Sequence, residues 1–416
     1  MKKLILLTAL IFVVAFSAGN ATLTRTLTMG DNNNIMIDDA NVRLYPSRVS
    51  NYPNIGSGEF CEGEMYYFGV NWKFNENNPW FLGTYFSTEW AETPYSFRGN
   101  RYFGTEFESF PSNRRVDLLL GHKLGSLNIG LGLTYVNSSQ SPEDTAYNYD
   151  HSYSRYGFTL GLTPDNGVWD LASYLSLATW KENYTFSEDG AAVVYLAEPD
   201  GYNDIEIRGR YFFEMNPTIT LVPHADLAFG EHTGLAAAAA TDGAEIYAEA
   251  IGYSSKLFSF GAGCGMNYTP VKNVLAVLDV GFTNRNVKED TAWLAVLTDI
   301  NGIVIDEESG EGQWKQSTMI LPYWKLGLEG EVFSWLDVRF GVTSNWTATK
   351  IENISKTNYA ANTSYLGLGF NWNRLHIDTY TDPELFLRGF DFISGRGNNE
   401  GGTYMNWQLS VRYEMF

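Results

Sequence analysis

Apolar and polar residues alternate along most of this chain, and this period of two constrains the fold more than any other feature. In NIGLGLTYV (128–136), every second residue from Ile129 to Tyr135 is large and apolar, and the residues between them are Gly or Thr. A side-chain period of two indicates β-strands with one apolar face. The same alternation recurs in residues 66–74, 155–163, 203–214, 323–333, 335–344, 364–372 and 405–416.

The connections between these segments are short and long in turn. The short ones are 75–79, 125–126, 164–167, 216–217, 269–273, 334 and 373, and the long polar stretches are 91–113, 138–151, 185–201, 231–250, 286–318, 349–362 and 388–403. A soluble β-sandwich has no reason to place every long loop at one edge. An outer-membrane barrel has short periplasmic turns and long extracellular loops, so the alternation of short and long connections favours a barrel.

We therefore predict an all-β fold, a transmembrane antiparallel β-barrel. The pattern gives about fifteen strands from residue 59 onward, and bacterial barrels have an even number. Sixteen strands result if residues 38–49 supply the extra one, and fourteen is the alternative. Aromatic residues beside the short turns fit the interfacial girdles of such a barrel, namely Trp72, Phe74, Trp80, Trp169, Phe333, Trp335 and Trp372.

The chain opens with the features of a secretory signal peptide. Lys2 and Lys3 precede an apolar run from Leu4 to Phe16, and small residues follow in SAGNA (17–21). This run is shorter than the roughly 20 apolar residues of a membrane-spanning helix. We predict a signal peptide over residues 1–21, an N-terminal segment over 22–58 and the transmembrane barrel over 59–416.

The charge balance narrows the expected partners. The net charge is −20, which opposes binding to nucleic acid, because such surfaces need basic patches. We expect the partners to be outer-membrane lipid, the barrel-assembly machinery and an unidentified small-molecule solute. The predicted location is the bacterial outer membrane.

Charged residues on the polar face of the strands are the candidate functional residues. In a membrane barrel this face lines the lumen, where opposed charges filter polar solutes. The same charges can instead pair between neighbouring strands and stabilise a wet interior, and the sequence leaves both interpretations open. The lumen-lining candidates are Arg208, Arg210, Asp226, Asp279, Lys325, Glu329 and Arg339.

The sequence offers little for catalysis. It has five histidines, and neither the H-E-x-x-H metal spacing nor a G-x-S-x-G nucleophile elbow occurs. His224 and Asp226 share the polar face of one segment, which fits a lumen wall better than a catalytic pair. The acidic run IDEESGEG (305–312) lacks the spacing of a calcium loop and fits a solvated loop tip. We predict no enzymatic activity, no metal and no cofactor.

The stretch DDANVRLYPSRV (38–49) resembles the N-terminal D-D-A…N-P-A signature of FadL-type outer-membrane long-chain fatty-acid transporters. It departs from that signature at Tyr45 and Ser47 and in a spacing one residue shorter. In that family the segment belongs to a hatch that plugs a fourteen-stranded barrel and gates hydrophobic substrates. The resemblance implies that residues 22–58 lie in the lumen, and the matching hatch candidates are Asp38, Asp39, Ala40 and Pro46.

The last twelve residues, MNWQLSVRYEMF (405–416), alternate as a closing strand. Outer-membrane barrels commonly end in such a strand with a terminal aromatic residue, which resembles the signal read by the assembly machinery. The candidates for that signal are Tyr413 and Phe416, although Tyr413 lies three residues before the end instead of two.

These features predict an outer-membrane channel or transporter through which small or hydrophobic solutes diffuse passively. The alternative is a surface-exposed structural or adhesion barrel that acts through its long acidic loops. A secreted, soluble β-protein is a third interpretation, and the alternation of short and long connections argues against it.

Overall fold

The computed structural model describes residues 22–61, 65–75, 77–88, 114–140, 147–188, 191–241, 245–299, 304–352, 355–381 and 407–415. The predicted signal peptide, the predicted loops 91–113 and 388–403, and Phe416 lie outside these residues. The described helices are α2 (Leu23–Thr28), η1 (Asp39–Arg43) and η2 (Pro46–Asn51). None of the helices in the described ranges is long and apolar enough to cross a membrane.

The strands are β1 (Ile55–Cys61), β2 (Met65–Lys73), β3 (Trp80–Thr88), β4 (Arg114–Leu124), β5 (Leu127–Gln140), β6 (Tyr147–Pro164), β7 (Trp169–Glu188), β8 (Ala191–Tyr211), β9 (Phe213–Asn216), β10 (Ile219–Thr241), β11 (Glu245–Val271), β12 (Val274–Asp299), β13 (Val304–Phe333), β14 (Leu336–Ile351), β15 (Ser355–Trp372), β16 (Leu375–Thr381) and β17 (Trp407–Glu414).

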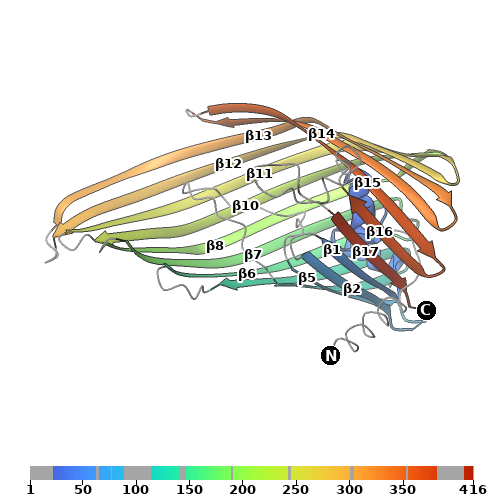
Figure 1. Ribbon diagram of the computed structural model, residues 1–416, viewed down its shortest axis with the longest axis horizontal. Coiled ribbons are helices and arrows are strands. Elements are labelled where there is room, and N and C mark those ends of the chain that lie inside the picture. Colours follow the sequence, from blue (N-terminus) through green and yellow to red (C-terminus); the bar gives the residue numbers. More distant parts are fainter. Residues whose placement is uncertain are drawn as a thin grey trace, which may run out of the picture.

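These strands form one antiparallel sheet closed into a barrel (Figure 1). Closure follows from β1, which pairs with β2 on one side and with β17 on the other. Only Phe212 separates β8 from β9, and both pair with β10, so the seventeen segments make sixteen barrel strands. The predicted antiparallel barrel of sixteen strands is confirmed.

The first barrel strand is not the one expected from the sequence. Residues 38–49 form the 3-10 helices η1 and η2, so the strand predicted there is wrong, and so is the alternative of fourteen strands. Local chemistry explains the difference. The Asp38 carboxylate accepts a hydrogen bond from the Ala40 amide, which stabilises a turn, and Pro46 has no amide hydrogen for a sheet. The barrel instead begins with β1 at Ile55.

The two faces of the barrel have opposite character, and β5 shows it clearly. Leu131 and Leu133 point outward and are each 50% exposed, whereas Thr134 points inward and is 8% exposed. In a soluble protein the apolar face would be the buried one. A wall that exposes its leucines and encloses its polar residues matches a barrel surrounded by lipid.

Strand length differs greatly around the barrel. β13 has 30 residues, which extend about 100 Å at roughly 3.3 Å per residue, whereas a bilayer core is about 30 Å thick. Figure 1 shows β10 to β13 extending far to the left, away from the end of the barrel that holds the helices. We call residues 232–241, 245–255, 289–299 and 304–314 the extended wall.

The extended wall corrects part of the loop prediction. The described residues of 231–250 and 286–318 all belong to strands, and so do nearly all described residues of 138–151, 185–201 and 349–362. Their sequence was interpreted as loop because neither face of these strand ends has a continuous apolar pattern. The pairing of β12 with β13 nevertheless runs from Val274 to Thr298.

Candidate functional site

Residues 22–54, called the inner segment, lie inside the barrel at the end with the short turns (Figure 1). Helix α2 contacts β14 to β17, and η2 contacts β3 to β6 on the other side of the barrel. Contacts with strands on opposite sides can only be made from within. Met29, Ile35, Val42 and Val49 have no exposed surface, so this segment occupies the interior at this level.

Glycines in the wall create the space for the inner segment. A Cβ atom added to Gly130 would lie 2.0 Å from the backbone nitrogen of Ser47, and one added to Gly327 would lie 2.3 Å from the carbonyl oxygen of Met29. No side chain fits at such distances, so the backbones touch directly. Gly161 and Gly341 also approach the backbone of the inner segment, whereas Gly121, Gly265 and Gly367 lie against its Val49, Ile35 and Thr28 side chains.

Arg25 anchors α2 to the wall. Its guanidinium donates two hydrogen bonds to the Glu329 carboxylate, each 2.7 Å long, and a third of 3.3 Å to Asp38 within the inner segment. Two parallel bonds between a guanidinium and a carboxylate fix both distance and orientation. Glu329 also accepts a hydrogen bond from Arg339, so the anchor continues across the wall.

Asp378 extends this anchor to β16. Its carboxylate accepts a hydrogen bond from Arg339 and another, 2.6 Å long, from the Thr22 hydroxyl. Thr24 hydrogen-bonds in turn with Ser410 of β17. The start of the inner segment is therefore held to three strands by polar contacts.

Arg210 of β8 holds the middle of the inner segment. Its guanidinium donates to the carbonyl oxygens of Asn33 (3.0 Å) and Met36 (2.7 Å), and lies 4.5 Å from the centre of the Tyr45 ring. A guanidinium offers five donors in a fixed plane, and here several of them bind backbone that no helix or strand satisfies. Arg210 thus fixes an irregular stretch of chain.

Asp170 of β7 lies between two arginines. Its carboxylate accepts from Arg48 at 2.8 and 3.0 Å, from Arg210 at 2.7 Å and from the Thr163 hydroxyl at 2.6 Å. The Asp170 side chain has no exposed surface. Because Arg48 belongs to η2, this carboxylate binds the inner segment directly, and it also binds Arg210, which holds Asn33 and Met36.

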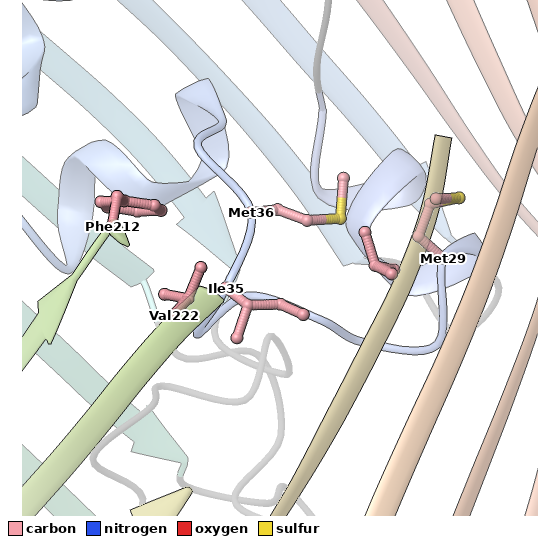
Figure 2. Packing of buried hydrophobic residues seen from close by; sticks show 6 residues of the cluster. Met29, Ile35, Met36, Phe212 and Val222 are labelled. Carbon is pink, nitrogen blue, oxygen red and sulfur yellow. The ribbon is translucent and has the colours of Figure 1, made fainter. Parts of the chain in front are cut away.

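An apolar cluster lies between these polar anchors. Figure 2 shows Met29, Ile35 and Met36 of the inner segment beside Phe212 and Val222 of the wall. Val277 completes the cluster. Close by, Lys325 donates to the backbone oxygen and the carboxylate of Asp31, at 2.6 and 2.8 Å. Two further clusters join Leu44 and Tyr45 to Ala172 and Tyr174, and Val42 to Tyr85 and Leu119, so the inner segment combines three small apolar contacts with several charged ones.

The seven predicted lumen residues have different surroundings. Arg210, Lys325 and Glu329 contact the inner segment directly, and Arg339 reaches it through Glu329. The other three contact neighbouring wall residues. Arg208 pairs with Glu206 and Asp279 with His224, while Asp226 lies where a side chain on Gly261 would be.

The four hatch candidates lie within the inner segment. Asp38 pairs with Arg25, Asp39 lies 3.3 Å from Arg412, and Pro46 contacts Gly130 and Gly161. Ala40 donates its amide to Asp38. Burial raises the pKa of Asp39 well above its usual range, although the nearby Arg412 opposes this. Burial likewise raises the pKa of Asp38 against the effect of Arg25.

Sequence reasoning missed Arg25, Arg48, Asp170 and Asp378. The two aspartates lie on the polar face of their strands, so the rule that selected Arg210 would also have found them. The two arginines had no such signal, because their partners are distant in the sequence. Glu329 is 304 residues from Arg25.

The end of the chain forms the closing strand of the barrel. β17 pairs with β16 and β1, and Tyr413 lies opposite Leu375 on one side and Gly56 on the other. The proposed assembly signal also requires Phe416, which lies outside the described residues, so that signal remains a prediction.

Comparisons with known proteins give remote likenesses of structure. No family model matches the sequence, and neither does any curated protein. The chain is similar to the toluene transporter TodX from Pseudomonas putida, with a TM-score of 0.42, 9% identity and coverage of 97% of this chain and 100% of that one.

Two further structures show the same level of likeness. The toluene transporter TbuX from Ralstonia pickettii has a TM-score of 0.39 and 10% identity, covering 95% of this chain and 97% of its own. The ferric yersiniabactin uptake receptor FyuA from Yersinia pestis has a TM-score of 0.36 and 8% identity, covering 86% and 79%. At such values, function has to be argued from the geometry of this chain itself.

Proposed function

We propose that this protein is a bacterial outer-membrane channel or transporter whose lumen is closed by the inner segment at the end with the short turns. Small solutes pass by diffusion when that segment is displaced. The outer face supports the membrane location, because leucine, phenylalanine and tryptophan side chains point away from the barrel on strand after strand. Such a surface is stable only against an apolar solvent.

The observation that carries the proposal is the way the inner segment is held. Its contacts with the wall include hydrogen bonds and ion pairs that involve Arg25, Arg48, Arg210 and Lys325, beside three small apolar clusters. A segment that existed only to fill the barrel would be expected to bury mainly apolar surface, as protein cores do. Polar anchors fix a closed position and can be exchanged for water when the segment moves.

The inner face of the wall suggests which solutes the channel favours. The inward-facing side chains of β4, β5, β7 and β8 include polar ones that are at most 8% exposed, among them Asp117, Thr134, Ser176, Asp204 and Glu206. When the interior opens, such groups favour small polar solutes over apolar ones. Movement through it is passive in this proposal and requires neither a cofactor nor energy coupling.

Conductance in planar bilayers tests this function. We expect the full chain to show low conductance with brief openings, and a variant lacking residues 22–52 to show a large, steady conductance. Heat-modifiable mobility in gels confirms that the shortened barrel has folded. A folded, shortened barrel that conducts no ions would contradict a channel.

A second variant keeps the chain complete. Arg25→Ala removes the paired contact with Glu329, and we expect it to increase the frequency of openings without changing the size of the fully open state. An unchanged opening frequency would show that this anchor does not control closure.

A further inference from the structure

The outermost edge of the extended wall is a strand with one unpaired side. Residues 304–314 of β13 pair with β12 on one side. On the other side, pairing with β14 begins only at Gln316, and the last backbone contact is the Glu352 amide, which donates to the Lys315 carbonyl at 2.9 Å. Among the described residues, nothing pairs with the β14 side of 304–314.

At the other margin of the extended wall, β10 is covered by β8, which itself has partners on both sides. Residues 191–199 of β8 pair with β10 on one side and, over most of their length, with β7 on the other. An unpaired strand edge presents a row of backbone donors and acceptors that another extended chain can bind. The edge of β13 has the length of a typical strand added in this way, since strands usually have about 3–10 residues.

The charge of this edge restricts its partner. Residues 304–314 contain four acidic side chains and no basic one, and the four are exposed. Because side chains alternate along a strand, Asp306 and Glu308 lie on one face of the wall, and Glu307 and Glu311 on the other. A partner with basic residues at successive positions would meet acidic groups on both faces.

We propose that residues 304–314 of β13 form a docking edge for an extended, lysine- or arginine-rich segment of another protein, which binds as an additional antiparallel or parallel strand. A second copy of this chain does not fit, because its identical edge would place like charges opposite one another. The edge lies at the end of the barrel remote from the inner segment, so a docked segment leaves the inner segment free (Figure 1). The inference therefore stands apart from channel activity.

The main competing explanation is that the acidic side chains only prevent wrong pairing. Charged residues commonly blunt sheet edges against aggregation. The two explanations differ in what a basic peptide does, since a protective edge has no affinity for one beyond diffuse attraction of charge. The experiment must therefore separate strand pairing from charge.

The test uses the full folded chain in detergent and a fluorescent peptide of alternating lysine and threonine, about twelve residues long to match the edge. The same peptide with methylated backbone nitrogens has equal charge but cannot pair as a strand. We expect saturable binding of the first peptide, with slower hydrogen exchange at residues 304–314. We expect binding of the methylated peptide to be weaker by about tenfold or more. Equal binding of both peptides, or unchanged exchange at 304–314, would overturn the proposal.

Two variants with matched charge complete the experiment. Asp306→Asn/Glu307→Gln/Glu308→Gln/Glu311→Gln removes the acidic groups of the edge. Asp165→Asn/Glu214→Gln/Glu231→Gln/Glu331→Gln removes as many exposed charges elsewhere. We expect only the first variant to lose affinity, by about tenfold or more. If the first variant instead dimerises and the unmodified chain does not bind the lysine peptide, the acidic groups only prevent wrong strand pairing and the proposal is wrong.

Discussion

The same strands have two different surroundings along their length. Near the short turns, β10 to β13 enclose the inner segment, and their inward glycines and charges contact it. In the extended wall, the strands continue with solvent-accessible side chains and a free edge on β13. The backbone pairing is continuous across both regions, so hydrogen bonds between strands do not distinguish them.

The difference lies in what the inward side chains touch. A charge beside the inner segment is bound to a partner from a distant part of the chain, such as Arg25 to Glu329. Asp290 of the extended wall is instead paired with Lys288 of its own strand and with Gln313 of the next strand. Removing a buried partner leaves the other charge without water or counter-charge, while removing an exposed one does not. The two regions should therefore respond very differently to the same kind of mutation.

The largest effect is expected at Asp170, whose buried carboxylate accepts hydrogen bonds from Arg48 and Arg210. Asp170→Ala leaves both guanidinium groups without their carboxylate partner. We expect the free energy of unfolding to fall by about 3–5 kcal/mol. Denaturant unfolding in detergent measures this. Asp165→Ala is the control, because Asp165 pairs with Lys123 at 3.1 Å in an open turn. Equal losses for the two variants would show that the buried position has no special role.

A steric change gives the next largest effect. Gly327→Val places a side chain against the Met29 carbonyl, and we expect a cost of about 1–3 kcal/mol together with greater exposure of the inner segment. Gly330→Val, three positions along the same strand, is a close control because nothing lies within 4 Å of its added Cβ. Hydrogen exchange of residues 22–36 reads out the displacement. Similar exchange in both variants would mean that the close contact at Gly327 does not position the segment.

The sequence predicts the barrel but only part of its contents. Alternation over segments such as 128–136 was enough to predict the closed antiparallel sheet, because lipid imposes a strict period on every crossing. The total of sixteen strands agreed although the extra strand was placed at residues 38–49 instead of at β1. The glycines opposite the apolar face, such as Gly130, were a further signal that the backbone of another segment comes close. The contacts themselves were not predictable, since pairs such as Arg25 and Glu329 form only when the barrel closes.

Two errors have local causes. Residues 38–49 alternate weakly but contain a capping aspartate and a proline, and these turn-forming groups determine the local structure. The sequence predicted a loop at residues 304–314 because these residues are acidic on both faces. A strand tolerates this pattern when a neighbouring strand, here β12, holds it in register. In both places side-chain hydrophobicity alone was a poor guide.

A smaller effect concerns pH and the inner segment. Burial raises the pKa of Asp39, so the docked state binds that proton more tightly than an undocked segment would. Docking is therefore favoured at pH values below the raised pKa and loses that contribution as the pH rises through it, from the ordinary value of 3.8 upward. We expect hydrogen exchange of residues 36–45, corrected for intrinsic rates, to increase with pH. Asp39→Asn should weaken this dependence, and an unaltered pH profile would exclude Asp39 as its source.

The smallest effect is expected at Lys315 of β13, which is compared with Lys325 of the same strand. Lys325 binds Asp31 of the inner segment, whereas Lys315 pairs with Glu352 at 3.3 Å, with both side chains about half exposed. Lys315→Ala should cost roughly 0.2–1 kcal/mol, as exposed pairs do. Lys325→Ala removes two charged hydrogen bonds and should cost more, about 1.5–3 kcal/mol. Unfolding midpoints of the two variants give the ratio. If Lys315→Ala proved as costly as Lys325→Ala, exposed ion pairs next to the extended wall would matter as much as those at the inner segment, and burial would no longer explain the contrast between the two regions.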